Sequence, residues 1–311
     1  VVERETLMPP LARICITAVA AGLWLLALEA AGEPPRAHEV VVDGHPLRVW
    51  EKAPEAPRAR ILLVHGRTWS TLPDFDLQVS GEDRSLMDGL VARDIAAFGV
   101  DLRGYGETPR DDSGWLTPER AVADVARVLE WLRARDPDRP RPYLFGWSYG
   151  AMVAQLVAQA RPELVSGLVL FGYPVRPGID DPVAGRDGEP PKEATTAEAA
   201  DADFVLPGAI SRDAVDAFVA AALEADPVRA DWRRLEQWRR LDGAEVRVPT
   251  LLLEAYHDPL ARDDVHAELF ARLDTHDKAW VVIPGGDHAA FLERPRRYFL
   301  DHLALFMRPR H

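Results

Sequence analysis

Residues 141–160 read RPYLFGWSYGAMVAQLVAQA and contain the pattern that decides the fold. The apolar run over residues 141–145 is typical of a buried strand, and residues 149–160 have the apolar spacing of a helix. Between them lies a Gly-x-Ser-x-Gly motif at residues 146–150, centred on Ser148. In this context the turn from strand to helix must be sharp, and it holds an exposed serine in a strained conformation. A plain strand–helix turn is the alternative, but it does not require glycine on both sides of the serine.

Outward from this motif, strand and helix patterns alternate along the chain. Two short β-prone runs around Asp43-Gly44 predict a hairpin. Buried strands are predicted at residues 60–64, 95–100, 141–145, 167–171, 248–254 and 279–283, and helices at 85–93, from Pro118 onward, at 149–160 and at 298–306. This order predicts an α/β fold with a doubly wound, mostly parallel sheet and right-handed crossovers.

One segment, residues 175–245, carries no strand signal. A stretch rich in Gly, Pro and Asp at residues 176–191 precedes helical patterns near 195–202, 211–225 and 229–241. A mostly helical insertion between two strands of one sheet suggests a lid over the carboxyl edge of that sheet. We therefore expect a core made of residues 37–174 and 246–311, and a helical lid made of residues 175–245.

The N-terminal segment contains an uncharged, mostly apolar run of 15 residues at positions 14–28 (ICITAVAAGLWLLAL), followed by Ala30-Ala31-Gly32. A membrane-spanning helix needs about 20 apolar residues. We therefore interpret residues 1–32 as a signal peptide that is cleaved before Glu33 and directs export to the periplasm or the medium. An uncleaved membrane anchor and an ordinary N-terminal helix are the alternatives. We expect membrane association, if any, only through residues 14–28. Without export or anchoring, the protein would be cytoplasmic.

Composition excludes several classes of protein. The chain has 311 residues, 47% of them hydrophobic, which is ordinary for a globular protein and excludes a fibrous or mainly disordered one. Thirty-seven basic against 50 acidic residues give a net charge of −13, which argues against a nucleic-acid partner. The single cysteine, Cys15, excludes an intrachain disulfide and a cysteine-based zinc cluster. A monomer is the default expectation for the oligomeric state.

A serine hydroxyl needs a base before it acts as a nucleophile near neutral pH. His288 follows the predicted strand 279–283 and the segment Pro-Gly-Gly-Asp, in a loop at the sheet edge where α/β proteins bind their ligands. We therefore predict His288 as the base. His65 also follows a strand, and His302 lies within the last helix, where a structural role is expected.

The base in turn needs a carboxylate that sets its tautomer and stabilises the imidazolium. Asp258 lies just past the strand 248–254, in another loop at this edge, and is our prediction for this role. Glu254 is expected to lie still within the strand. Asp263 and Asp264 are expected to begin the next helix, and Asp287 is expected to serve the turn before His288.

The oxyanion that forms during attack needs at least two hydrogen-bond donors. The backbone N–H of Tyr149, at the start of a helix, is one candidate. The backbone N–H of Arg67 is the other, because Gly66 lets the chain approach the substrate closely. The alternative is that His65-Gly66 only ends a strand. Trp69 and Trp147 are the candidate substrate contacts.

The chain resembles the α/β-hydrolase family over about residues 40–308. His65-Gly66 resembles the oxyanion-loop motif of that family, residues 101–106 (DLRGYG) resemble the loop after the next strand, and residues 146–150 resemble its nucleophile elbow. Ser148, Asp258 and His288 follow the family order. The resemblance is strongest to the branch of serine aminopeptidases, lysophospholipases and small esterases. The loop at residues 69–82 is longer than in many members. Serine at the elbow separates the chain from dehalogenases and epoxide hydrolases, which use aspartate there.

These residues predict a serine hydrolase that forms an acyl-enzyme, most simply on carboxylic esters, without a metal or organic cofactor. An aminopeptidase would need a lid carboxylate for the free amine, and Glu224, Asp226 and Glu236 are available. Thioesterase, C–C hydrolase and perhydrolase chemistry use the same three residue types. A non-catalytic binding protein on this fold and an anchored scaffold are the alternatives from other classes. Four aromatic residues of the expected lid are predicted to pack it onto the core rather than to line an acyl pocket: Phe204, Phe218, Trp232 and Trp238.

Overall fold

A computed structural model describes residues 33–173, 188–260 and 263–308. The chain divides into two units, residues 1–33 and 34–311. The predicted signal peptide or anchor, with Cys15, lies outside the described residues, as does most of the loop predicted at 176–191. Within the described ranges, no helix combines the length and hydropathy needed to span a membrane.

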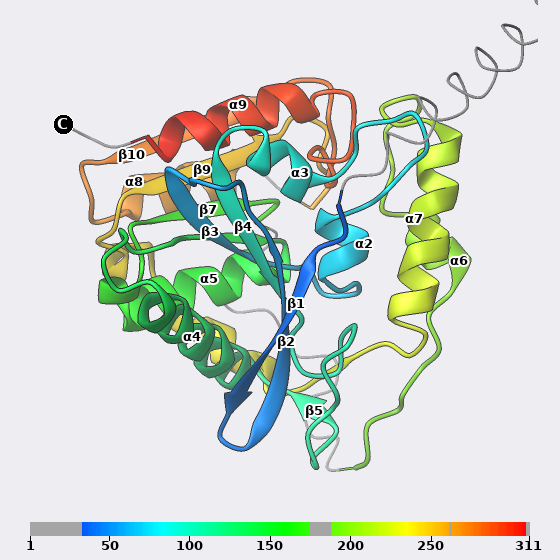
Figure 1. Cartoon of the computed structure of the whole chain (residues 1–311), viewed down its shortest axis with the longest axis horizontal. Coiled ribbons are helices and arrows are strands. Elements are labelled where there is room, and N and C mark those ends of the chain that lie inside the picture. Colours follow the sequence, from blue (N-terminus) through cyan, green and yellow to red (C-terminus); the bar gives the residue numbers. More distant parts are fainter. Residues whose placement is uncertain (1–32, 174–187, 261–262, 309–311) are drawn as a thin grey trace, which may run out of the picture. The chain divides into compact units, whose positions relative to one another are not determined.

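The predicted α/β fold is confirmed. An eight-stranded sheet has the strand order β1-β2-β4-β3-β6-β7-β9-β10 (Figure 1), in which β1 pairs antiparallel with β2, β2 pairs antiparallel with β4, and all other neighbours are parallel. The strands span β1 (Arg36–Val42), β2 (His45–Lys52), β3 (Ala59–Val64), β4 (Ile95–Val100), β6 (Tyr143–Trp147), β7 (Gly167–Phe171), β9 (Thr250–Ala255) and β10 (Lys278–Ile283). Asp43 and Gly44 form the predicted two-residue hairpin turn, since Val42 pairs directly with His45.

Helices cover both faces of this sheet (Figure 1). One face carries α4 (Pro118–Arg135), α5 (Tyr149–Ala160) and α8 (Asp263–Arg272), and the other carries α3 (Leu86–Val91) and α9 (Arg296–Phe306). Strand side chains alternate between the two cores: Leu62 and Val64 of β3 pack with α4 and α5, whereas Ile61 and Leu63 pack with α3 and α9. Burial on both faces explains why the central strands are continuous apolar runs.

The stretch between β7 and β9 forms an insertion, described over residues 188–249. It contains α6 (Ala197–Asp201), α7 (Arg212–Ala225), β8 (Asp231–Trp232) and two 3₁₀ turns, η3 (Leu235–Arg240) and η4 (Gly243–Glu245). Helix α7 begins where the sequence predicts, and the Ser211 hydroxyl accepts the N–H of Ala214 as its N-cap.

The sequence prediction was wrong for residues 229–241. Instead of one helix, this stretch contains β8, which pairs in parallel with β5 (Trp115–Leu116), followed by η3. The long loop at 69–82 contains the short helix α2 (Thr71–Phe75), and η2 (Pro162–Leu164) follows α5. A two-residue strand has no periodicity of its own and exists because its partner supplies the hydrogen bonds, so the sequence pattern missed it.

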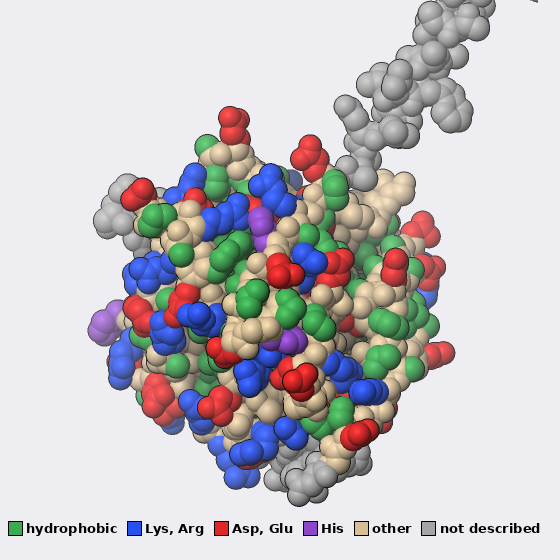
Figure 2. Space-filling model, turned by 60° about the horizontal axis from the view of Figure 1, so that its bottom comes forward, with side chains coloured by type: hydrophobic (Ala, Val, Ile, Leu, Met, Phe, Trp, Pro, Cys, Tyr) green, Lys and Arg blue, Asp and Glu red, His purple; other side chains and the backbone are tan. Residues whose placement is uncertain are grey.

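Acidic and basic side chains are interspersed on the surface shown in Figure 2 rather than gathered by sign. The net charge of −13 therefore does not form one acidic patch on this face.

Candidate active site

Ser148 lies between the end of β6 and the start of α5, with φ 55° and ψ −119°. A positive φ is rare for a residue with a side chain and marks a backbone held in strain by its surroundings. The Ser148 N–H donates to the carbonyl of Phe171 in β7 (3.0 Å). Ser148 is buried, at 8% exposure, whereas the sequence predicted an exposed serine. The sharp turn predicted from the motif is therefore present.

The two glycines of the motif are required by close packing. A Cβ on Gly146 would lie 2.1 Å from the carbonyl oxygen of Gly150, and a Cβ on Gly150 would lie 2.2 Å from that of Val64 in β3. Strand β6, helix α5 and strand β3 thus approach each other more closely than any side chain permits. The two glycines are therefore required by the packing of these three elements, in addition to any role of the serine.

His288 and Asp258, predicted from separate post-strand loops, lie side by side. His288 Nδ1 is 2.7 Å from Oδ2 of Asp258, and both residues are buried. The second oxygen of Asp258 accepts the N–H of Leu260 (2.9 Å), and the N–H of His257 donates to the carbonyl of Gly286, which joins the two loops. Since Nδ1 donates to the carboxylate, Nε2 is the nitrogen that accepts a proton.

The same neighbourhood contains the serine. Trp147, which precedes Ser148, packs its ring 5.2 Å from the His288 ring and donates its indole N–H to the His288 carbonyl (2.7 Å). The carbonyl that accepts the Ser148 N–H belongs to Phe171, and Gly172 follows it. A Cβ on Gly172 would be 2.9 Å from Cε1 of His288. The structure thus brings Ser148, His288 and Asp258 to one place at the carboxyl edge of the sheet.

His65 lies beneath the loop that is predicted to supply an oxyanion donor. Its ring is fully buried, and burial lowers its pKa to about 4, so it is neutral near pH 7. The N–H of Leu102 donates to Nε2 (3.1 Å), which leaves Nδ1 to donate to the Gly66 carbonyl (2.9 Å). Both ring nitrogens are therefore in use, and His65 is not a second base.

The backbone of Arg67 is held on both sides. The peptide between Gly66 and Arg67 is trans, so fixing the Gly66 carbonyl through His65 also fixes the Arg67 N–H, which points the opposite way. The Arg67 carbonyl accepts the Tyr105 hydroxyl. Gly66 lies beside the elbow, where an added Cβ would be 3.6 Å from Cβ of Ser148. The Arg67 guanidinium lies 5.0 Å from the centre of the Tyr149 ring, a cation–π distance that joins the two candidate donor residues.

Buried carboxyl groups surround the same loop. Asp226, at the C-terminus of α7, accepts the N–H groups of Ser70 and Gly106 (both 2.8 Å). Asp74 faces the Gly66 N–H at 3.5 Å, and burial together with the neighbouring acids raises its pKa well above the usual range. The sequence reasoning missed both structural roles, because each carboxylate binds backbone groups that leave no motif.

The two candidate substrate contacts are buried by protein in this structure. Trp69 is 1% exposed and donates its indole N–H to Asp203 of the insertion (2.7 Å), and Trp147 is 3% exposed. Substrate contact by either residue stays a prediction. The packing role predicted for the insertion's aromatic residues is confirmed: Trp232 donates to the Tyr105 hydroxyl (2.7 Å), and Phe218 packs against Trp69.

The remaining candidates have other partners. Glu254 lies in β9 as predicted, and its carboxylate is 2.6 Å from Nδ1 of the buried His266. His302 contacts the carbonyl of Tyr298 within α9, as a structural residue does. Asp263 and Asp264 begin α8 as predicted. Among the described residues, no cluster of three or more His, Cys, Asp or Glu side chains has the arrangement that a metal ion needs.

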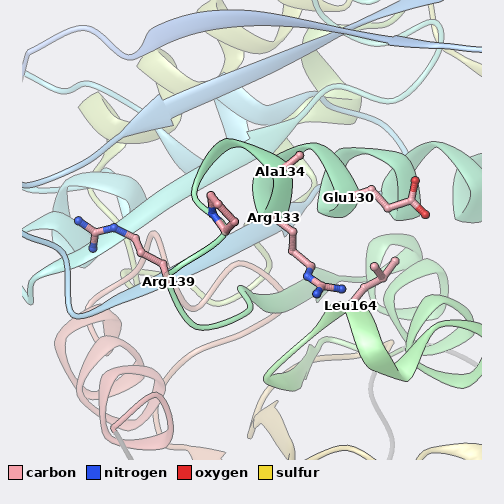
Figure 3. Close-up of a pocket in the computed structure, with 6 residues that line it drawn as sticks. Glu130, Arg133, Ala134, Arg139 and Leu164 are labelled. Carbon is pink, nitrogen blue, oxygen red and sulfur yellow. The ribbon is translucent and has the colours of Figure 1, made fainter.

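A hollow of about 310 Å³ lies far from this edge (Figure 3). Its lining comes from the end of α4 and from residues that precede β6 and β7: Glu130, Arg133, Ala134, Pro137, Arg139 and Leu164. Because β6 and β7 run parallel, the segments that precede them lie at the amino edge of the sheet, opposite Ser148. The Glu130 and Arg133 side chains that Figure 3 shows also have partners nearby, in Arg161 and the Glu163 carbonyl. The hollow is therefore not part of the site.

Comparison with known proteins decides the family. The sequence model of the serine aminopeptidase S33 family matches residues 55–295. The chain belongs to this family. The resemblance seen in the motifs is thereby confirmed, and the protein is an esterase-like hydrolase with the α/β-hydrolase fold.

Individual relatives of this hydrolase are distant. It is 28% identical to lipase LipV of Mycobacterium tuberculosis over 235 residues, which is 73% of the chain and 74% of the relative. It is 33% identical to polyketide synthase ThaQ of Burkholderia thailandensis over 165 residues, 48% of the chain, but spans only 8% of the length of that protein. Among solved structures, a thermophilic esterase from Thermogutta terrifontis superposes with a TM-score of 0.65 at 19% identity, covering 88% of the chain and 98% of the esterase. This last likeness supports the fold alone.

Proposed function

We propose that the protein is a serine hydrolase that cleaves carboxylic esters through an acyl-enzyme, with Ser148 as nucleophile, His288 as base and Asp258 as the group that orients His288. The observation that carries the proposal is the 2.7 Å contact between His288 Nδ1 and Asp258, buried beside a serine with a positive φ. The proposal agrees with the esterase-like class of the protein and with relatives such as the lipase LipV.

In the proposed reaction, Ser148 Oγ attacks the ester carbonyl carbon while its proton passes to Nε2 of His288. The carbonyl oxygen becomes an oxyanion, which accepts hydrogen bonds from the backbone N–H groups of Arg67 and Tyr149. The C–O bond to the leaving alcohol then breaks as the imidazolium returns the proton to that oxygen. Water, deprotonated by the same imidazole, attacks the acyl-enzyme, releases the carboxylic acid and restores the Ser148 hydroxyl.

The oxyanion loop supports this chemistry because its geometry is set before substrate arrives. His65 fixes the Gly66–Arg67 peptide, and Tyr105 fixes the next carbonyl. Donors that are already oriented cost no reorganisation during the reaction, and one such donor typically contributes about 10²–10³ in rate.

Ester hydrolysis is preferred over aminopeptidase activity because of what the three candidate amine ligands of the insertion do. Both oxygens of Asp226 already accept backbone N–H groups, and Glu236 pairs with Arg234 at 2.5 Å. Glu224 is exposed on α7. None of these three acids thus offers the buried, uncommitted carboxylate that would bind a substrate's free amine.

The test measures hydrolysis of p-nitrophenyl esters from acetyl to palmitoyl by the wild type, Ser148→Ala and His302→Ala. We expect turnover that is lost by at least about 10³-fold in Ser148→Ala and kept in His302→Ala, whose ring contacts Tyr298 of its own helix. Labelling by a fluorophosphonate should require Ser148. Folded wild-type protein that neither turns over an ester nor takes the label would refute the proposal and favour a ligand-binding protein on this fold.

A further inference from the structure

The residue before His288 contacts the insertion directly. Asp287 is fully buried, and its Oδ2 accepts the backbone N–H groups of Val205 (2.8 Å) and Leu206 (2.7 Å). Its other oxygen, Oδ1, accepts the N–H of Ala289 (3.1 Å). One carboxylate therefore holds both the turn around His288 and a segment some 80 positions away in sequence.

Glu293 keeps this carboxylate in place from the other side. The Asp287 N–H donates to Oε2 of Glu293 (2.8 Å), and burial together with the Asp287 carboxylate raises the pKa of Glu293. Three backbone N–H donors face the Asp287 carboxylate itself. A hydrogen bond from the Arg294 N–H to the Ala209 carbonyl (2.8 Å) adds a second link between these segments.

The same segment of the insertion also reaches the oxyanion loop. Asp203, two residues before Val205, accepts the indole N–H of Trp69 at 2.7 Å. Trp69 follows Arg67, the candidate oxyanion donor, by two residues. Residues 203–206 therefore bridge the two loops that carry the proposed base and the proposed oxyanion donor, and these loops come from opposite ends of the chain.

A turn before His288 does not by itself require this arrangement. The bond from Ala289 to Oδ1 satisfies the turn, and a serine or asparagine would supply it equally well. The two bonds to Oδ2 serve only the insertion. Burying a carboxylate is costly unless its oxygens are satisfied, so the arrangement makes the position of residues 203–206 and that of the His288 loop depend on each other.

We propose that Asp287 is a positioning residue that holds residues 203–206 of the insertion against the His288 loop, so that the docked insertion sets the working position of His288. The effect on turnover rests on the proposed function, whereas the contact itself does not. Docking of the insertion then acts on chemistry and not only on access to the site.

The experiment compares Asp287→Asn with Glu82→Gln. Asparagine has one acceptor oxygen, so it serves either Ala289 or the insertion and turns its NH₂ toward the donors that remain. Glu82 also holds the insertion, accepting the Ser211 hydroxyl at 2.6 Å. It pairs with Arg84, which donates to the Leu292 carbonyl four residues past His288, whereas Asp287 adjoins His288 itself. The pair therefore separates anchoring of the insertion from positioning of His288.

Two readouts are measured on folded protein. Hydrogen exchange at the Val205 and Leu206 amides should be slow in the wild type and in Glu82→Gln and at least about tenfold faster in Asp287→Asn. The kcat for p-nitrophenyl acetate and octanoate should fall about tenfold in Asp287→Asn, equally for both esters. If the insertion acted only as a steric lid, its release would instead change KM, and the change would depend on the acyl-chain length of the ester.

Fast exchange of these two amides in the wild type would overturn the proposal, and this measurement needs no variant. A kcat of Asp287→Asn within about twofold of the Glu82→Gln value, at equal loss of thermal stability, would also overturn it, because Asp287 would then be structural only. If the wild type hydrolyses no ester, the proposed function fails, while the exchange measurement still decides whether Asp287 holds the insertion.

Discussion

Replacing Gly172 by alanine is the most direct test of the position of His288. Gly172 has φ +57°, and an added Cβ would lie 2.9 Å from Cε1 and 3.1 Å from Nδ1 of His288. Carbon atoms in ordinary contact are at least 3.4 Å apart, so the imidazole must retreat by about 0.5 Å. The contact of 2.7 Å between Nδ1 and Asp258 limits this retreat. The position of an alanine Cβ is fixed by the backbone, and a third contact, 3.2 Å to Cδ1 of Trp147, limits a backbone shift that would relieve the clash.

The expected cost has two parts. Alanine at a positive φ destabilises the fold by about 1–2 kcal/mol. Displacing a base by a fraction of an ångström lowers kcat by about 10- to 100-fold, or about 1.4–2.7 kcal/mol of barrier. Gly44→Ala is the matched control, because Gly44 has φ +79° in the β1–β2 turn and an added Cβ there has nothing within 4 Å.

The assay combines thermal unfolding with initial rates on p-nitrophenyl acetate. Both variants should lose the stability that a positive φ costs alanine, and Gly172→Ala should lose about 1–3 kcal/mol more because of its clash. Only Gly172→Ala should lose activity. Full activity in Gly172→Ala at the stability of Gly44→Ala would show that the observed place of His288 has no bearing on the reaction, and the proposed role of His288 would fall.

Two further predictions concern stability, and each is measured by denaturant unfolding. Burial lowers the pKa of His65 to about 4 in the folded protein, so the unfolded chain binds more protons than the folded protein between about pH 6.5 and 4. The free energy of unfolding should therefore fall by up to about 3 kcal/mol as pH drops through this range. His65→Gln should lack this part of the pH dependence, and parallel curves of stability against pH for the two proteins would contradict the prediction. Asp124→Ala should destabilise by about 3 kcal/mol, since it removes the carboxylate 2.7 Å from the buried Arg103 and leaves only the weaker pair with Asp111 at 3.7 Å. The exposed pair of Arg247 and Asp274 supplies the control, in which Asp274→Ala should change stability by less than about 0.5 kcal/mol.

Elements that carry their own pattern could be predicted from the sequence. Strand β4 has the predicted bounds, Ile95–Val100, because every residue in it is buried and the apolar run ends where burial ends. Helix α4 begins at the predicted Pro118, since Thr117 caps the Arg120 N–H. Strands β5 and β8 were missed because neither has an intrinsic signal, and each depends on a partner more than 100 residues away.

The candidate site shows the same distinction between residues that a sequence pattern reveals and residues that it does not. Ser148, Asp258 and His288 were found because each follows a strand of a parallel sheet, and the carboxyl ends of such strands meet at one edge. The acids that organise the loops were not found in these roles. Asp226 was considered as an amine ligand, yet it accepts two backbone N–H groups, and Asp287 was assigned to a turn, yet it also holds the insertion. Side chains that bind distant backbone leave no spacing in the sequence by which to recognise them.

These acids change how the insertion should be understood. The insertion provides Asp203 to Trp69, Asp226 to Ser70 and Gly106, and Asp231 to Arg110. Every one of these partners lies in the loops that follow β3 and β4, and buried donors left unpaired cost about 1–3 kcal/mol each. Deleting the insertion would therefore not simply uncover a preformed site. It would remove the acceptors that order the loop carrying Arg67, so this loop and the insertion form one cooperative unit. If Arg67 is the oxyanion donor as proposed, a truncated core is expected to bind and turn over esters poorly even where it folds.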